Sequence, residues 1–305
     1  MAFVDGPPCA NAAVIDCSWV APAAGELCAS CALTRTTPDL ADPVAVGAWS
    51  SAELQKRRLV LQLLQLGLPV VPFTDDPDHG MAFDLLYSTD GSITVGHADG
   101  VITIDVGEDD DARRARLRDR LGERYRTLLG HLRHEVGHFY FPMLVEATDA
   151  IESFRTLFGD ERADYAAALE AHYAGTERDP AEWQDAYVSA YATAHPWEDW
   201  AESFAHVLHI LGVLGVTDRF GLQLEGDRWA PTVDAPELPK THASMPDILA
   251  AWVPLSVALN AINRAMGLDD IYPFVLGPTA REKLLFVYER IASVRPRCEV
   301  VPVPS

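Results

Sequence analysis

The feature that most constrains this chain is the stretch from His131 to Phe141, which reads His-Leu-Arg-His-Glu-Val-Gly-His-Phe-Tyr-Phe. It contains the pattern H-E-x-x-H, with His134 and His138 at its two ends. Residues at that spacing share one face of an α-helix, so the two imidazoles can hold one zinc ion together. Glu135 lies one step round the helix and can reach a water molecule at that ion. The stretch therefore predicts a metal-binding helix.

A zinc ion that acts in catalysis needs three protein ligands and one open position, so a third ligand must come from elsewhere. A helix is predicted to begin at Pro196, because proline suits the first helical turn. It carries Glu198 and Glu202 one turn apart on a shared face. We expect Glu198 to bind the zinc and Glu202 to hold a zinc-bound histidine, with Glu202 as the rival ligand. His131 lies on the same helix face as His134 and His138, but a fourth protein ligand would close the open position. We therefore expect His131 to contact the metal ligands or to pack against neighbouring side chains.

Four of the five cysteines lie close to the N-terminus, at Cys9, Cys17, Cys28 and Cys31. Only the last pair has the tight CxxC spacing of a zinc knuckle. Four thiolates leave no open coordination position, so the cluster predicts a structural zinc site that organises this segment. Buried or incidental cysteines are the alternative. Cys298 stands alone and is left without a role.

The charge balance argues against two classes of partner. The chain has 305 residues and a formal net charge of −21. Such an acidic surface repels nucleic-acid phosphates and anionic membranes, so neither is expected as a partner. The N-terminus lacks the basic start and apolar run of a targeting segment, and the apolar run at 207–216 is too short for a bilayer. We expect a cytoplasmic protein, and the oligomeric state is not indicated.

The rest of the chain reads as a mainly helical α+β fold. Two strands are predicted at 81–87 and 100–106, and the second is expected to lie beside the active-site cleft, where it could pair with an extended peptide. Residues 220–246 read as a long loop, and Lys56 to Arg58 as a solvated helix face. The predicted helices cover residues 50–64, 113–141, 154–173, 180–192, 196–211, 246–266 and 278–292, with breaks expected at Gly159-Asp160 and at 175–179.

Several of these motifs together resemble a known family. They lie at 96–97, 100–104, 125–131, 133–138, 158–160, 187–191 and 195–206, and the last, which contains Trp-Glu-Asp-Trp-Ala-Glu, is the most specific. The chain is similar over nearly its whole length to the bacterial zinc-binding metallopeptidases that carry an N-terminal zinc-ribbon segment. The resemblance implies a zincin-like metallopeptidase domain at 46–305 with a small sheet, preceded by a ribbon-like segment at 1–45. An earlier cysteine pair associated with the family is missing here, so the ligand set of the ribbon departs from the pattern.

The pattern Glu198-x-x-Ala201-Glu202-x-Phe204 resembles the third-ligand helix of glutamate zincins such as the anthrax lethal factor. That likeness implies Glu198 as the ligand and Glu202 as its support. It also implies that Tyr191, at the matching offset, stabilises the oxyanion. The alternative donors are Tyr187, His97, His195 and His206.

The mechanism expected from these residues is zinc-assisted amide hydrolysis. Glu135 would take a proton from the attacking water and pass it to the leaving amine. The cofactors would be one catalytic and one structural zinc ion, and the partner a peptide or protein substrate. A zincin-fold binding or sensory protein without turnover is the alternative from another class. An isopeptidase or amidase would share the mechanism and differ only in substrate.

Overall fold

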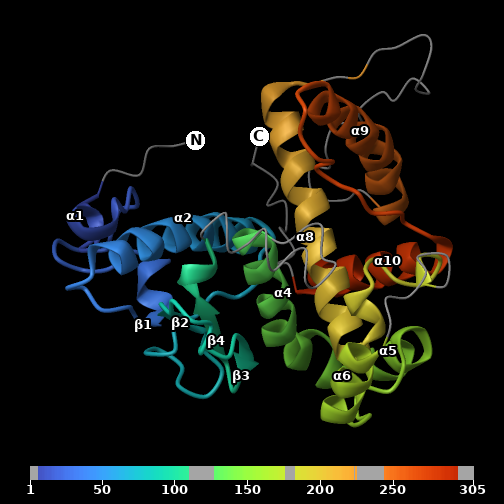
Figure 1. Ribbon diagram of the computed structural model, residues 1–305, viewed down its shortest axis with the longest axis horizontal. Coiled ribbons are helices and arrows are strands. Elements are labelled where there is room, and N and C mark those ends of the chain that lie inside the picture. The colour runs from blue at the N-terminus through green and yellow to red at the C-terminus, as the bar shows by residue number, and fades with distance from the viewer. Residues whose placement is uncertain (1–5, 110–126, 176–182, 223, 225–243, 295–305) are drawn as a thin grey trace, which may run out of the picture.

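In a computed structural model of the chain, residues 6–109, 127–175, 183–222, 224 and 244–294 are described (Figure 1). Most of them are helical, and four short strands form a single mixed sheet. The mainly helical α+β class predicted from the sequence is therefore confirmed. The predicted helix between 113 and 126, most of the predicted loop after 224 and Cys298 lie outside the described residues.

The sheet has the order β1-β2-β4-β3. β2 (Ala82–Leu86) and β4 (Val101–Asp105) match the two predicted strands and pair in parallel, as β1 (Thr34–Thr36) does with β2. β3 (Gly96–Ala98) runs antiparallel to β4. The sequence analysis missed β1 and β3, because three residues are too few to show an alternating pattern.

A tight Asp-Gly turn joins β3 to β4. Asp99 and Gly100 both have positive φ, at 49° and 78°, which is the conformation of a two-residue hairpin turn with the twist of the flanking strands. β4 is therefore covered on one side by β2 and on the other by β3. The prediction that β4 has a free edge for pairing with a peptide is wrong, because β3 lies beside it and forms that edge of the sheet.

Helix α2 (Pro43–Gln65) begins seven residues before the predicted start at Ser50. Its cap is Asp42, whose carboxylate accepts a hydrogen bond from the amide of Val44 at 2.9 Å, and proline occupies the first turn. The sequence analysis placed the cap at Ser50, but that serine lies inside the helix, where its hydroxyl donates to the carbonyl of Ile15 at 3.0 Å.

Two of the three residues in the basic run on α2 are buried rather than solvated. Lys56 is fully buried, and its ammonium forms an ion pair with Glu53 at 2.8 Å and a hydrogen bond with Thr34 of β1. Arg57 is also buried, whereas Arg58 is exposed. The prediction of a solvated face is therefore wrong for Lys56 and Arg57, because the N-terminal segment covers their side of the helix.

Two helices carry the predicted metal ligands and pack against each other more extensively than any other pair among the described residues. α4 (Leu128–Phe141) is capped by Thr127 and ends where the chain turns at Pro142. α8 (Pro196–Phe220) begins at Pro196, as predicted, and continues nine residues beyond its predicted end. Figure 1 shows α4 between the sheet with α2 on one side and α8 on the other. α4 is therefore held in place by the sheet and α2 on one side and by α8 on the other.

The remaining elements follow the prediction at the C-terminus and depart from it in the middle of the chain. α9 (Met245–Ala265) and α10 (Pro278–Ser293) match their predicted helices. The helical stretch predicted at 154–173 forms α5 (Ile151–Phe158) and α6 (Tyr165–Ala174), and the predicted break at Gly159 and Asp160 is confirmed. Residues 184–190 form turns before the 3-10 turn η4 (Tyr191–Thr193). The short elements are α1 (Ala12–Ile15), η1 (Cys31–Leu33), η2 (Val106–Asp109) and the π-turn η3 (Pro142–Glu146).

In its described part, the helix predicted over 180–192 is interrupted: residue 183 is helical, but residues 184–190 form turns and bends. The carbonyl of Ala186 accepts a hydrogen bond from the ammonium of Lys283 on α10 at 2.8 Å. The hydroxyl of Ser189 accepts one from the amide of Ala192 at 3.1 Å. These tertiary and side-chain contacts satisfy backbone groups that a helix would have paired internally.

Two helices are long and apolar enough to cross a membrane by length and composition, α8 with 25 residues and α9 with 21. The predicted apolar run at 207–216 is thus part of a longer helix. In α8, 56% of the most apolar window is buried inside the protein. The same helix also buries the carboxyl groups of Glu198 and Asp199, so α8 serves as a core helix of this fold.

Candidate metal centre

Three predicted ligands from the two packed helices converge on one point. The ligand atoms of His134, His138 and Glu198 all lie within 4.8 Å of one another. Glu198 Oε2 is 3.0 Å from His134 Nε2 and 3.4 Å from His138 Nε2. The two ring nitrogens are 3.1 Å apart. Two imidazoles and one carboxylate at such distances are the donor set of a catalytic zinc site.

The hydrogen bonding of these atoms also fits a cation. Glu198 Oε2 is buried and accepts no well-aligned hydrogen bond, although both histidines face it. Buried carboxylate oxygens without partners are rare, because desolvation is costly unless a proton donor or a metal compensates it. A cation between the three atoms would satisfy all of them at once. The residues present therefore fit a bound zinc ion.

Glu202 holds His134 from the other side of its ring. Its Oε1 atom is 2.8 Å from His134 Nδ1, and its Oε2 atom accepts a hydrogen bond from the hydroxyl of Ser189 at 2.5 Å. A carboxylate on Nδ1 fixes the ring orientation and leaves Nε2 free to bind metal. The geometry thus matches the supporting role expected for Glu202. Ser189 was not identified from the sequence, because no spacing pattern links it to α8.

Glu135 lies beside this cluster, as its position in the motif requires. Its Oε1 atom is 3.1 Å from His131 Nε2, while its Oε2 atom is buried without a hydrogen-bond partner. Burial alone would raise the pKa of Glu135, but the hydrogen bond from His131 and the neighbouring histidine charges outweigh it and lower the pKa to about 2. Glu135 is therefore an ionised, half-paired carboxylate with one oxygen free to accept a proton.

Two tyrosines approach the centre from different elements. The ring of Tyr191 lies 5.9 Å from that of His134, measured between ring centroids. The phenol of Tyr165, the first residue of α6, donates a hydrogen bond to Glu198 Oε1 at 2.6 Å and also interacts with Tyr191. Burial and the charge of Glu198 raise the pKa of both tyrosines, so each keeps its proton. Tyr165 was missed because nothing in its spacing relates it to the ligand helix.

The alternative donors fall into two groups. Tyr187 packs its ring against the Lys283 ammonium, 3.9 Å from the ring centroid. His195 caps α8, accepting from the amide of Trp197 at 3.1 Å, while its other nitrogen lies 3.1 Å from a backbone carbonyl. His206 is buried, with Nδ1 2.7 Å from the hydroxyl of Tyr272. These three residues have structural contacts of their own.

His97 is the remaining donor close to the centre. It lies on the edge strand β3, with its ring against Phe139, and its Nε2 atom is buried without a hydrogen-bond partner. Burial, followed by the nearby His138, lowers its pKa to about 4, so the ring is neutral. His97 thus stays the chief rival of Tyr191.

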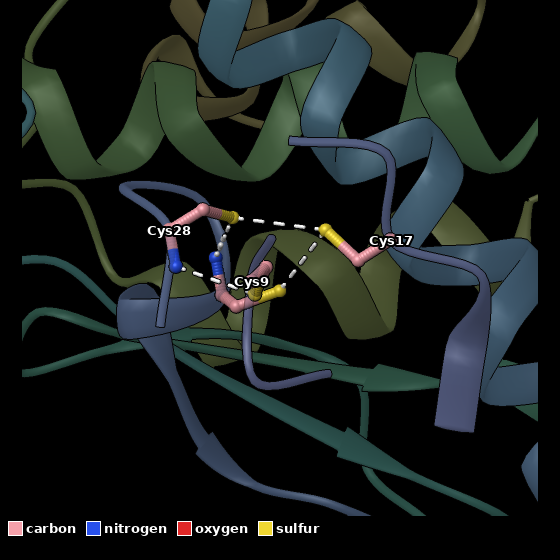
Figure 2. A group of neighbouring side chains, drawn as sticks. Cys9, Cys17 and Cys28 are labelled. Carbon is pink, nitrogen blue, oxygen red and sulfur yellow. Dashed lines mark hydrogen bonds between the residues drawn. The ribbon is translucent and has the colours of Figure 1, made fainter. Parts of the chain in front are cut away.

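The four N-terminal cysteines form a second cluster (Figure 2). All are buried and none is in a disulfide. The sulfur of Cys17 is 3.8 Å from that of Cys28 and 3.7 Å from that of Cys31, and the four sulfurs lie within 4.8 Å of one another. Figure 2 shows the side chains of Cys9, Cys17 and Cys28 directed towards a common point. The arrangement supplies the four soft ligands of a closed tetrahedral zinc site.

Backbone amides donate hydrogen bonds to two of these sulfurs. The amide of Cys28 donates to the sulfur of Cys9 at 3.3 Å, and the amide of Cys31 donates to the sulfur of Cys28 at 3.4 Å. A hydrogen bond from the Cys31 thiol outweighs burial and lowers the pKa of Cys28 to about 5, whereas burial raises the pKa of Cys17 and the hydrogen bond to Cys28 raises that of Cys31. Since thiolates are the form that binds metal, these contacts prepare Cys28 in particular as a ligand.

Comparisons with known proteins agree with this geometry. A family model described as putative zinc-binding metallo-peptidase matches residues 45–290. Uncharacterised proteins of Mycobacterium bovis and Mycobacterium tuberculosis are 45% identical over 294 residues, which is 95% of this chain and 84% of each relative. No solved structure matches the chain. The match over most of the chain, together with the ligand geometry, shows that this protein belongs to the family of putative zinc-binding metallo-peptidases.

Proposed function

We propose that this protein is a zinc-dependent hydrolase that cleaves peptide or other amide bonds. The observation that carries the proposal is the convergence of His134, His138 and Glu198 beside a buried, ionised Glu135. Zinc held by the three ligands would supply a Lewis acid and make a water molecule acidic enough to lose its proton near neutral pH.

The protein's own groups perform the remaining steps. Glu135 takes the proton of the attacking water on its free oxygen and passes it to the leaving amine. Its contact with His131 keeps the carboxylate ionised and fixes its orientation. Tyr191 keeps its proton at neutral pH and donates a hydrogen bond to the oxyanion that develops on the substrate carbonyl. Glu202 holds His134 in the tautomer whose Nε2 atom can bind the metal.

The substrate is proposed as a peptide or protein, because the net charge of −21 disfavours nucleic acids and anionic membranes. The cytoplasmic location stays a prediction. The presence of Glu135 favours an enzyme over a protein that only binds a partner, since a recognition module needs no general base beside its metal. An isopeptidase or amidase would use the same groups on a different amide.

The test of this function is a comparison of Glu135→Gln with wild type on a broad peptide library. The library is a tryptic digest of a denatured proteome, and mass spectrometry counts new peptide termini. We expect wild type to generate new termini and Glu135→Gln to generate none, while zinc content and thermal stability stay at wild-type levels. Glu289→Gln, the same change at an exposed position on α10, is the control and should cleave normally.

The outcomes separate the candidate functions. Equal cleavage by wild type and Glu135→Gln would remove Glu135 from its proposed role. No cleavage by either protein, with zinc bound in both, would point to a non-peptide amide or to a binding protein. A panel of isopeptide-linked and small amide substrates would then distinguish those two.

A further inference from the structure

The two oxygens of Glu198 have different surroundings. Oε2 faces the two histidines and accepts no well-aligned hydrogen bond. Oε1 accepts a hydrogen bond from the phenol of Tyr165 at 2.6 Å. Since the carboxylate is almost completely buried, solvent does not compete for either oxygen. The contact with Tyr165 therefore decides which oxygen is available at the centre.

Helix α6 brings Tyr165 to this position. The helix is capped by Asp164, whose carboxylate accepts from the amide of Ala167 at 3.0 Å, and Tyr165 is its first residue. None of its residues is fully buried, and Leu169 and His172, one and two turns on, are half-buried. Leu169 and His172 thus mark the face of α6 that is turned towards the protein. Tyr165 begins this face and is itself 36% exposed, but its phenol reaches Glu198.

Aromatic contacts fix the ring of Tyr165. It lies edge-on to Trp197 and to His195, with centroids 5.5 Å and 5.3 Å away. Trp197 in turn lies against the ring of His138, with centroids 3.8 Å apart. The phenol is therefore held in place by residues that flank Glu198 and contact a ligand.

We propose that Tyr165 is a positioning residue that restricts Glu198 to binding the metal through one oxygen. A carboxylate can bind a metal with one or both oxygens, and a hydrogen bond to one of them favours one-oxygen binding. This keeps a coordination position open for water and substrate, which a catalytic zinc site requires. The inference rests on the metal site proposed above and adds the residue that controls its coordination number.

The test uses cobalt(II), which binds zinc sites and reports coordination number through its visible absorption. Four-coordinate cobalt absorbs more strongly in the visible than five-coordinate cobalt, because a tetrahedral field mixes more p character into the d orbitals and so makes the d–d transitions more strongly allowed. We compare wild type with Tyr165→Phe, which keeps the ring and removes only the hydroxyl. Tyr173→Phe is the matched control, since Tyr173 is on the same helix and is 61% exposed.

The cysteine cluster would also bind cobalt, so its absorption must be removed. In Glu198→Ala we expect only the cysteine cluster to bind cobalt, and its spectrum is therefore subtracted from those of the other variants. We expect Tyr165→Phe to absorb more weakly and to bind cobalt about 10- to 100-fold less tightly, in the range found for partners of metal ligands. Without metal, Tyr165→Phe should unfold at a somewhat lower temperature, because Oε1 of the buried Glu198 loses its hydrogen-bond donor. The spectrum of Tyr173→Phe should match wild type.

The possible results separate this inference from the proposed function. A Tyr165→Phe spectrum and affinity equal to those of wild type would overturn the inference and leave the metal site intact. A wild-type spectrum equal to that of Glu198→Ala would overturn the metal site itself, and the role of Tyr165 with it. Equal weakening in Tyr165→Phe and Tyr173→Phe would assign the effect to α6 as a whole and also overturn the inference.

Discussion

The half-buried Glu202 carboxylate is hydrogen-bonded at both of its oxygens, to His134 and to Ser189. Desolvation would raise its pKa, but the contact with His134 outweighs it and lowers the pKa. Nδ1 of the His134 ring faces Glu202, and Nε2 of the same ring faces Glu198. Which nitrogen each carboxylate meets supports the proposal that Glu198 is the ligand and Glu202 its partner.

At the same scale we predict the effect of Tyr191→Phe. Loss of one donor to the oxyanion should lower kcat by roughly 10²–10³, with KM and zinc content little changed, because the contact strengthens only as charge develops. Steady-state kinetics on a peptide cleaved by wild type would measure this. Tyr187→Phe is the control and should be near wild type, since that ring packs on Lys283. An unchanged kcat in Tyr191→Phe would shift the role to His97.

At the level of elements, the site depends on how closely α4 approaches α8. Gly137, between the two metal-binding histidines, has no side chain to separate the helices. A Cβ atom there would lie 3.0 Å from the Cα of Ala201 and 3.2 Å from the Cβ of Phe204. The indole of Trp200 also donates to the Gly137 carbonyl at 2.8 Å. Glycine is therefore a packing requirement at this point of the motif.

We predict opposite effects for two glycine-to-alanine changes. Gly137→Ala should lower the free energy of unfolding by about 1–3 kcal/mol, because backbone on α8 must shift to admit the methyl group. It should also weaken zinc binding, since the same shift moves Glu198 relative to the histidines. Gly47→Ala on α2 meets nothing within 4 Å and should raise the free energy of unfolding by about 0.5–1 kcal/mol. Urea denaturation of both variants measures the difference, and equal effects would contradict the packing argument.

A second element-scale prediction concerns the attachment of β1 to β2. Arg35 on β1 donates to the carboxylate of Asp84 on β2, with Nε 2.9 Å from Oδ1. The hydrogen bond from Arg35 lowers the pKa of Asp84 below its ordinary 3.8. A carboxyl group with a lowered folded-state pKa stabilises the fold above its unfolded pKa, and this contribution is lost as the pH falls through the folded value.

A double-mutant cycle of Arg35→Gln and Asp84→Asn tests this pH dependence. The arginine side chain is 43% exposed, so solvent screens the pair and we expect a coupling energy of only about 0.5–1 kcal/mol near neutral pH. The coupling should shrink below about pH 4 as Asp84 becomes protonated. A coupling that stays constant from about pH 7 to pH 3 would contradict an ionic interaction.

For the molecule as a whole, the cysteine cluster and the metal centre share one framework. η1 contains Cys31 and leads directly into β1, which joins the sheet through β2. β3 and β4 of that sheet contact α4. β1 is also tied to α2 by Thr34, which donates to Glu53 at 2.5 Å. Whether residues 1–45 also fold as a unit of their own stays a prediction.

The prediction at this scale is a zinc count by elemental mass spectrometry. Wild type should hold about two zinc ions per chain, and Glu198→Ala and Cys28→Ser should each hold about one. Cys28→Ser should also lower the melting temperature, because a structural zinc site contributes folding free energy. Cys298→Ser is the matched control and should keep both ions and the wild-type melting temperature. Two ions in Cys28→Ser would remove the thiolate cluster from its role.

Local patterns were enough to locate the candidate metal-binding residues. The H-E-x-x-H spacing and the pair of glutamates behind Pro196 depend only on the helical period, so both faces formed as predicted. The family assignment followed from the same motifs and is confirmed. The clustering of the four cysteines, by contrast, was a hypothesis from composition, and the fold brings them together.

The sequence by itself therefore determined the two helices of the candidate metal centre, the residues that face one another there and the class of fold. Only the tertiary structure decided that Tyr165 meets Glu198, that Ser189 holds Glu202, that β3 ends the sheet, and that residues 184–190 are not helical. The physical reason is the separation in sequence between the residues that make each contact. Helical faces are set by neighbours within two turns, whereas these features depend on contacts between segments far apart in the chain, whose meeting no local periodicity encodes.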